Sequence, residues 1–560
     1  MMFRKYSDIY IILIALLLVL ISYFFYFRID LTEDKRYSVS DLTKELLQST
    51  NKEMKVTVFL DGDLNQGFRT LKSATADMLA EMSLYASQGI QVDFVNPSEA
   101  DTQDEREKKY AALAAEGLIP TAIYEKDKEG KAMQKIVFPW MKIEYGNKSV
   151  LVNLLKNVRG LSGAENLNVS VENLEFEITD GMRRAMTTTV SKIAFIEGHG
   201  ELTEAETYDI SKSLSRYFQI DRGVIASDAS ILSPYKAIIV ARPTQAFSET
   251  DKLIIDQYIM NGGSVLWLMD AVRVSKENLS KSGISPAMEL DVNLSDQLFK
   301  YGVRLMPVLL QDVQCVQVPV NIAPAGQEPQ FEPSPWYFAP LLLSSYQHPI
   351  TKNITEVRSE FASALETVGE NKDVKSTLLL ASSDNTHLLA TPTTIDVGEV
   401  PAPSDKHYFD KAYVPVAILL EGRFRSNFEN RVLPEGICEL SQVKTQGDFA
   451  RQIVIADGDI IRNETNGIAS DSTTLPLGFD RYMNQQFGNA DFIRNAVLYL
   501  ANDSRWLELR ARTVKLRLLN KRILADERHL LQIINVLLPL LILALGGVIY
   551  IFIRRYKNTR

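Results

Sequence analysis

Three side chains able to do acid–base chemistry follow an apolar segment at residues 193–196: Glu197, His199 and Glu201. A histidine beside a carboxylate can ligate a metal ion, or act as a general base that the carboxylate orients. The same residues also suit a turn, because the glycines between them allow backbone angles that other residues avoid and Glu201 can begin a helix. We favour the turn. An envelope hydrolase or amidotransferase-like site at His199 and Glu201 is the alternative.

A second acidic group follows another apolar segment, at Asp457-Gly458-Asp459. Two carboxylates this close together can hold a hard cation. No full set of ligands surrounds them in the sequence, and the same residues are typical of the turn that ends a strand. We favour the turn and keep Asp457 and Asp459 as candidate residues for binding a ligand or a partner.

Motifs of known catalytic or metal-binding type are missing from the sequence. The histidines are scattered without HExxH or comparable spacing: His199, His348, His387, His407 and His529. No GxxxxGK[ST] loop is present to hold the phosphates of ATP. The GxSxG nucleophile turn and its cysteine counterpart are missing too. The sequence therefore predicts no catalytic residue, no cofactor and no metal ion.

Aromatic and proline residues gather between positions 319 and 340, where Trp336, Tyr337 and Phe338 follow one another. The stretch ends a long predicted insertion at residues 271–340, and long insertions of this kind are often functional. An aromatic, proline-rich surface segment can bind a partner protein. Alternatively, the segment folds back over an edge strand of a sheet. Trp336 and Tyr337 are therefore candidate contacts for a ligand or a partner.

The elements that must position these candidates lie between residues 190 and 500. Apolar strands alternate there with amphipathic helices: strands near 193–198, 237–240 and 264–269, helices near 204–217 and 248–260. This alternation predicts a parallel, doubly wound α/β sheet of the flavodoxin or glutamine-amidotransferase type. Further strands are predicted at 376–381, 414–420 and 452–456, and a helix at 491–500. Such sheets bind ligands at the carboxyl ends of their strands, where His199 and Asp457 would lie.

A smaller domain is predicted at residues 40–160. Ser40 suits the N-cap of a first helix, after which a β-α-β pattern runs from residue 55 to 95. The order of the predicted elements resembles the thioredoxin-like fold, and Pro120, just ahead of a strand, stands where that fold usually keeps a cis proline. The loop at 61–67 lacks a thiol and no CxxC motif exists, so disulfide exchange is excluded and a binding or spacer role remains. The two cysteines, Cys315 and Cys438, can pair or stay free.

Apolar stretches at residues 9–27 and 533–553 bracket the chain, and neither contains a charged side chain. Each has about the 20 residues that a helix needs to cross about 30 Å of hydrocarbon. The end of the first stretch lacks the small residues of a signal-peptide cleavage site, which favours an uncleaved anchor. We therefore expect two transmembrane helices flanking the α/β domains.

Charge patterns bear on topology and partners. Basic residues at both tails favour cytoplasmic termini and a large periplasmic region, although basic residues after the first span oppose this. The segment at 505–532 is rich in arginine and lysine: a solvated face, or a surface that docks on lipid headgroups or on an acidic partner. A net charge of -9 argues against a nucleic-acid partner.

Several segments together resemble one family, the gliding-motility ABC transporter auxiliary or substrate-binding subunit GldG. They are DLTEDKRYSVS at 30–40, FIEGHGEL at 195–202, QYIMNGGSVLWLMD at 257–270, LFKYGVR at 298–304, IVIADGDIIRN at 453–463, and the segment 514–539 ending in LQIINVLLP. The resemblance implies a non-enzymatic subunit that assembles with a permease and a separate cytoplasmic ATPase in the cytoplasmic membrane. It implies no catalytic residue and does not identify a ligand.

Overall fold

The computed structural model divides the chain into two compact units, residues 1–513 and 514–560. The predicted first span at 9–27 lies outside the residues that the structure describes, as does most of the basic segment at 505–532. These residues are 38–126, 132–158, 161–225, 230–321, 323, 327–345, 348–369, 372–398, 405–434, 443–466, 473–503, 506–507, 509 and 528–558.

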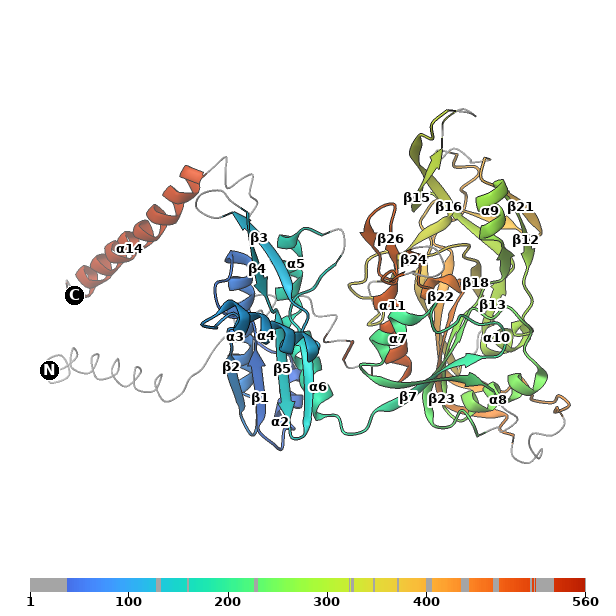
Figure 1. Ribbon diagram of the computed structural model, residues 1–560, viewed down its shortest axis with the longest axis horizontal. Coiled ribbons are helices and arrows are strands. Elements are labelled where there is room, and N and C mark those ends of the chain that lie inside the picture. The colour runs from blue at the N-terminus through green and yellow to red at the C-terminus, as the bar shows by residue number, and fades with distance from the viewer. Residues whose placement is uncertain are drawn as a thin grey trace. The chain divides into compact units, whose positions relative to one another are not determined.

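The first domain is built on a four-stranded sheet in the order β2-β1-β5-β6 (Figure 1). Its strands are β1 (Met54–Val58), β2 (Ile90–Phe94), β5 (Trp140–Tyr145) and β6 (Lys148–Asn153). β1 and β2 are parallel, which requires a crossover, and helix α3 (Gln66–Ser83) supplies it. The other two pairings are antiparallel. Helix α2 (Asp41–Gln48) begins at Ser40, whose side chain accepts a hydrogen bond from the Thr43 N–H, which confirms the predicted N-cap.

Helices after the fourth strand complete the same core. α5 (Gly163–Glu172) and α6 (Leu174–Met186) follow β6, and the apolar face of α6 is buried with the residues of β1 and β5. Gly181 lets α6 approach closely, because a Cβ there would lie 2.4 Å from Val152 Cγ2. This domain therefore continues through residue 186.

The segment between β2 and β5 holds α4 (Gln103–Ala115) and a separate two-stranded hairpin, β3 (Thr121–Lys126) with β4 (Ala132–Val137). The cis peptide bond among the described residues is Thr391–Pro392. The expectation of a cis bond at Pro120 was therefore wrong, and Pro120 only precedes the β3 hairpin strand.

The larger domain holds a mixed ten-stranded sheet, in which five neighbouring strands are parallel, in the order β23-β10-β9-β7-β8. They are β7 (Ser191–Glu197), β8 (Phe218–Val224), β9 (Tyr235–Ala241), β10 (Ser264–Leu268) and β23 (Gln446–Ile455). Every residue of β10 is buried, as expected for a strand covered on both faces. The covering helices are α7 (Tyr208–Leu214), α8 (Glu249–Met260) and α11 (Asn489–Leu500) (Figure 1).

Strand β8 was not predicted from the sequence. Its segment, Phe-Gln-Ile-Asp-Arg-Gly-Val, carries two charged side chains and lies at the edge of the sheet. The predicted helix at 204–217 is also shorter, because it begins only at Tyr208. Adding β8 beside β7 reverses the strand order at β7, since β9 lies on the other side of β7.

The expectation of a wholly parallel sheet was wrong for the later strands. β16 (Phe331–Ser344), β19 (Val374–Ala381) and β22 (Pro415–Arg425) join β23 through antiparallel pairings. Parallel neighbours need a long crossover, usually a helix, and no helix lies between β19 and β22 among the residues described there. The result is a mixed sheet.

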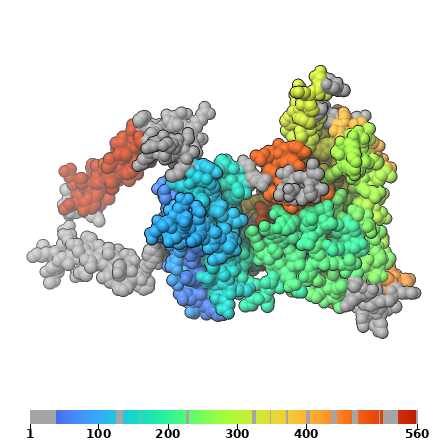
Figure 2. All heavy atoms as spheres, viewed as in Figure 1, coloured from blue at the N-terminus to red at the C-terminus, as the bar shows by residue number. Residues whose placement is uncertain are grey.

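The predicted insertion forms regular structure. It contains β11 (Val272–Val274), α9 (Lys276–Ser282), β12 (Ile284–Glu289), α10 (Ser295–Tyr301), β13 (Val303–Met306), β14 (Val308–Asp312), β15 (Cys315–Asn321) and the first part of β16. β15 and β16 pair as a hairpin that stands out from the domain, in yellow in Figure 2. β16 also pairs with β19 through Leu343 and Ser344, so the strand that carries the aromatic stretch joins the sheet at its end.

The second unit contains helix α14 (Arg528–Asn558). Residues 532–556 of α14 are long and apolar enough to cross a membrane. This segment contains the predicted span at 533–553.

Candidate functional site

The parallel strands bring both predicted acidic turns to one edge of the sheet. β7, β9, β10 and β23 run in the same direction, so their carboxyl ends meet there. His199 follows β7, Arg242 follows β9, Asp270 follows β10, and Asp457 follows β23. Doubly wound sheets bind ligands at this edge. The turns differ in what surrounds them.

The turn after β7 is closed around His199, whose side chain is 7% exposed. Its Nδ1 lies 3.1 Å from Glu201 Oε1, and its Nε2 lies 3.2 Å from Asp251 Oδ2 on α8. The ring stacks on Phe247, with ring centroids 3.6 Å apart. Burial lowers the pKa of His199, but its contacts with both carboxylates outweigh burial and leave the pKa above the ordinary histidine value. Both ring nitrogens are engaged, so neither is open to a substrate or a metal ion.

The Glu197 side chain has different partners from the His199 side chain. Arg222 of β8 donates a hydrogen bond of 2.7 Å to Glu197 Oε1, and its guanidinium lies over the Phe195 ring. Glu197 therefore does not join the His199 and Glu201 group. Gly200 adopts a positive φ of 71°, and a Cβ there would lie 2.2 Å from Thr244 Oγ1. The glycine spacing noted in the sequence thus serves a tight turn.

The turn after β23 is built around two carboxylates with different electrostatics. Asp457 accepts hydrogen bonds from the backbone N–H groups of Glu360 (2.9 Å) and Asp459 (2.7 Å). Burial, together with the neighbouring Asp270 and Asp459, raises the pKa of Asp457 well above its usual range. Burial also acts to raise the pKa of Asp459, but Lys276 and two arginines outweigh it, and the pKa of Asp459 is lowered. The surroundings of the turn therefore favour the charged form of Asp459 and disfavour that of Asp457.

Arg242 links this turn to the neighbouring strands. Its Nε lies 2.8 Å from Asp270 Oδ2 and 3.5 Å from Asp459 Oδ1. The backbone of Arg242 has a φ of 56°, which is uncommon for a residue with a side chain. Gly458 accommodates it, because a Cβ at Gly458 would lie 2.6 Å from Arg242 Cβ. This geometry fixes where Asp459 emerges at the sheet edge.

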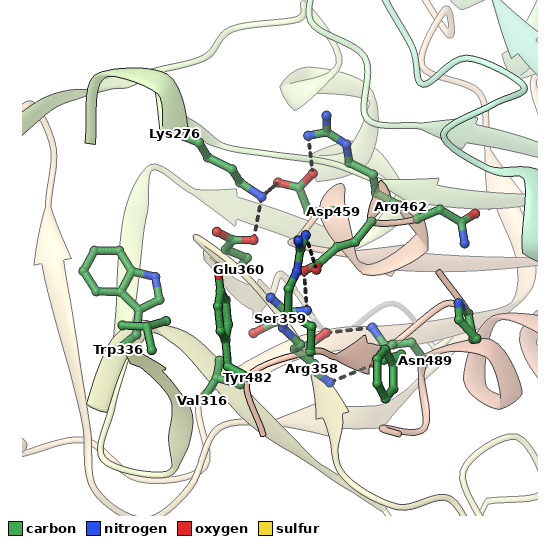
Figure 3. A pocket seen from close by; sticks show the side chains of 17 residues that line it. Lys276, Val316, Trp336, Arg358, Ser359, Glu360, Asp459, Arg462, Tyr482 and Asn489 are labelled. Carbon is green, nitrogen blue, oxygen red and sulfur yellow. Dashed lines mark hydrogen bonds and ion pairs between the residues drawn. The ribbon is translucent and has the colours of Figure 1, made fainter. Parts of the chain in front are cut away.

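A pocket of about 370 Å³ opens beside Asp459 (Figure 3). Its wall comes from the insertion, from the loop around Glu360, from the turn after β23 and from the segment before α11. The lining residues are Lys276, Val316, Val318, Trp336, Arg358, Ser359, Glu360, Asp459, Arg462, Asn463, Glu464, Pro476, Gly478, Phe479, Arg481, Tyr482 and Asn489. Two of the residues singled out in the sequence, Trp336 and Asp459, therefore line one cavity although they are far apart in the chain.

Ion pairs cover much of this wall. Lys276 Nζ lies 2.5 Å from Glu360 Oε2 and 3.5 Å from Asp459 Oδ2. Burial acts to lower the pKa of Lys276, but the two carboxylates outweigh it and raise the pKa, so the ammonium is charged. Arg462 lies 3.0 Å from Glu206 and 3.4 Å from Asp459. The oxygens of Asp459 are thus surrounded by cationic side chains.

This arrangement bears on the predicted choice between a cation site and a turn. Among the residues that the structure describes, no group of three or more His, Cys, Asp or Glu side chains is placed to hold a metal ion. Asp459 faces Lys276, Arg242 and Arg462, which would repel a cation. The geometry favours a turn whose carboxylate organises basic side chains.

Trp336 and Tyr337, the two aromatic candidates of the insertion, have different surroundings. Trp336 lines the pocket and packs on Phe338 (ring centroids 5.2 Å apart) and edge-on against Phe361 (6.3 Å). Tyr337 is 3% exposed and packs edge-on against Phe409. Trp336 can contact a bound molecule, whereas Tyr337 belongs to the core.

Most of the pocket was not visible in the sequence. Lys276, Arg358, Glu360 and Tyr482 come from separate loops and elements, with no shared motif or spacing. Among the residues that the sequence did not single out, Arg462 and Asn463 at least follow the Asp457–Asp459 turn in the chain.

Comparison with known families identifies the larger domain. Residues 191–496, more than half of the chain, match the family described as "ABC-type uncharacterized transport system". The chain belongs to this family. It is an auxiliary component of an ABC-type transport system. The matched region of this transport component runs from β7 into α11 and includes both turns and every lining residue of the pocket. Residues 33–144 match a second family, "Domain of unknown function (DUF7088)".

Other comparisons of the transport component are weak. Among curated proteins, none matches. The solved mmIFT52 N-terminal domain is 13% identical, covering 55% of this chain and 97% of that chain, with a TM-score of 0.31. A catalytic mutant of Gan42B, a GH42 beta-galactosidase from G. stearothermophilus, is 10% identical, covering 52% of this chain and 44% of that chain, with a TM-score of 0.17. Scores this low carry no argument about fold or function.

Proposed function

We propose that the chain is a non-enzymatic, membrane-anchored subunit of a GldG-type ABC transporter linked to gliding motility. It assembles with a permease and a separate cytoplasmic ATPase, and its large domains bind a ligand or an envelope protein in the periplasm. The observation that carries this proposal is the family match over residues 191–496 in a chain without a phosphate-binding loop. Energy for transport would then come from another subunit.

Two anchors fit this assignment. The helix at 532–556 is one, and the apolar stretch at 9–27 is the second. Two spans leave both termini on one side of the membrane, and the basic tails favour the cytoplasm. In this arrangement the first domain and the mixed sheet face the periplasm, and α14 with the N-terminal span packs on the permease.

The domain folds we infer also suit binding better than catalysis. The order β2-β1-β5-β6, with one parallel and two antiparallel pairings, supports a thioredoxin-like domain, which here lacks the CxxC thiols needed for exchange. The order β8-β7-β9-β10-β23 corresponds to second, first, third, fourth and fifth in the chain, the order of flavodoxin-like sheets. At its reversal point between β7 and β9, His199 is enclosed by two carboxylates. That enclosure disfavours the alternative hydrolase.

Co-purification tests the proposal directly. The full chain with a removable tag is solubilised in a mild detergent and purified from its native membrane, and the bound proteins are identified by mass spectrometry. We expect a multispan permease and an ATPase with a phosphate-binding loop. Recovery of a lone polypeptide, or ATP hydrolysis by the purified chain alone, would contradict the assignment.

A matched control asks whether the anchor makes the contact. In one variant, an unrelated apolar helix of the same length replaces residues 532–556, which keeps membrane attachment and changes the packing surface. We expect this variant to reach the membrane and to recover much less permease than the native chain. Equal recovery would move the proposed contact away from α14.

A further inference from the structure

We propose that the pocket beside Trp336 binds a neutral, polyhydroxylated molecule with one apolar ring face, the chemistry of an uncharged saccharide. The inference deepens the proposed function, on which its biological role rests, by naming the class of ligand. The cavity of about 370 Å³ falls within the range of about 300–1,000 Å³ that is usual for small-molecule sites. Charge, hydrogen-bonding groups and aromatic surface each point to this class.

Each cation of the wall is paired with at least one carboxylate. One run of ion pairs passes from Glu206 through Arg462, Asp459 and Lys276 to Glu360. A second run joins Asp480, Arg358, Glu464 and Arg481. Four cations and three carboxylates of these runs line the pocket, and two further carboxylates, Glu206 and Asp480, pair with lining arginines without lining it themselves. An anion or a cation would have to displace one member of a pair, whereas a neutral molecule leaves every pair in place.

The same runs present hydrogen-bonding groups of both kinds. Ammonium and guanidinium groups only donate, and ionised carboxylates only accept, while a hydroxyl group does both. The pocket therefore offers alternating donors and acceptors to neighbouring hydroxyls of one ligand. Because the ion pairs already hold these side chains, little side-chain freedom is lost when a ligand binds. Glu360 and Glu464 remain partly open, with side chains 22% and 32% exposed.

Aromatic surface completes the site. Trp336 is held in place by Phe338 and Phe361 and forms part of the pocket wall (Figure 3). Tyr482, also on the wall, is 59% exposed. The face of an aromatic ring carries negative potential and packs well on the C–H face of a saturated ring. A saccharide ring has such an apolar face, with hydroxyls around its edge that can reach the ion pairs.

Saturation-transfer NMR on the full chain tests the inference. The protein is kept in a polyoxyethylene detergent, because maltoside detergents are themselves sugars. The probes are maltose, cellobiose, lactose and diacetylchitobiose, compared with glucuronate and glucosamine as charged ring compounds. We expect at least one neutral saccharide to receive saturation, and both charged compounds to receive much less. No transfer to any of the four neutral probes, or stronger binding of a charged compound, overturns the inference.

Two variants locate the binding site. Trp336→Ala and Tyr482→Ala should each weaken binding of the active saccharide about tenfold, equivalent to the loss of one good aromatic contact. Tyr482 is exposed, so its variant keeps the fold even if removal of Trp336 disturbs the hairpin. Phe299→Ala is the control, because Phe299 is an exposed aromatic residue outside the pocket. Binding that survives the Tyr482 change, or that fails equally in the Phe299 variant, overturns the assigned site.

The outcomes remain separate from the test of the proposed function. A chain that co-purifies with permease and ATPase but binds no saccharide keeps the proposed function and loses this inference. A chain that binds a saccharide at Trp336 but purifies alone keeps the site and loses the assembly.

Discussion

The turn after β7 and the turn after β23 stand at the same edge of one sheet and hold similar residues, yet their environments are opposite. At the first, His199 is enclosed by Glu201 and Asp251 and stacked on Phe247. At the second, Asp459 faces a pocket among partly exposed ion pairs. Position at the carboxyl edge is therefore not enough to make a site. What decides is whether neighbouring elements close over the turn or leave room beside it.

The first prediction concerns the closed turn and has the largest expected effect. Glu201→Gln removes one of two carboxylates that hold the buried His199 ring, and the Glu201 side chain is only 2% exposed. Breaking a buried pair on one side costs about 3–5 kcal/mol. We expect the free energy of unfolding to fall by about 3 kcal/mol, measured by urea unfolding of the full chain in detergent.

Glu360→Gln at the open turn is the matched control. Glu360 is 22% exposed and pairs with Lys276, which is 41% exposed, so water screens the loss. We expect a change below about 1 kcal/mol. Equal effects of the two substitutions would erase the proposed contrast between a closed and an open turn.

The second prediction separates backbone strain from crowding. Gly200→Ala and Gly369→Ala both place a side chain at a φ of 71°, but only Gly200 has a neighbouring atom, Thr244 Oγ1, in the way. Left-handed backbone costs a residue with a side chain about 1–2 kcal/mol. We expect that loss for Gly369→Ala and about 1 kcal/mol more for Gly200→Ala, by the same unfolding measurement.

Thr244→Ala in the Gly200→Ala background provides the check. Removing the crowding hydroxyl should recover part of the extra loss, although the Thr244 hydrogen bond to the Gly200 carbonyl is lost as well. No recovery would mean that crowding at this turn is not the cause.

The third prediction uses pH and has the smallest expected effect. Contacts with carboxylates leave the pKa of His199 raised, so its contribution to stability is complete below the ordinary pKa of about 6.5. That contribution is lost as the pH rises through the raised pKa. Unfolding free energies of native chain and His199→Gln, measured between pH 5.5 and 8.5, should therefore converge at the alkaline end.

His348 offers a control of opposite sign. Burial lowers its pKa, so folding favours the neutral ring and the associated penalty disappears as the pH rises above about 6.5. The His348→Gln variant should accordingly differ most from the native chain at the acid end. The same pH dependence for both variants would refute the idea that their surroundings set the sign.

Much of the fold could be predicted from periodicity. Regularly spaced apolar residues predicted strands β7, β9 and β10 and the helix α8 that lies between β9 and β10. The structure has these elements where the sequence indicates. β8 was not predicted because this edge strand carries charged side chains and lacks a continuous apolar pattern. The antiparallel direction of β19 and β22 escaped because strand patterns do not reveal which neighbour a strand pairs with.

The candidate site was predictable only in pieces. Asp459 drew attention through its place after a strand, and Trp336 through its aromatic neighbours. Lys276, Glu360 and Tyr482 gave no signal, because their roles depend on contacts between distant parts of the chain. The same dependence explains why Tyr337 was a candidate: aromatic residues in succession look equivalent until the register of β16 sends alternate side chains to opposite faces.

The position of β23 in the chain has a consequence for biosynthesis. β10 is wholly buried in the folded domain, and its partner β23 is translated only after the insertion, β16, β19 and β22. At about 5–20 residues per second, ribosomes leave the hydrogen-bonding edge of β10 without its neighbour for many seconds. Nascent chains that stop before residue 446 keep this edge of β10 with its backbone groups unpaired. Because an unpaired edge can pair with another chain, we expect such fragments to aggregate or to be bound by chaperones.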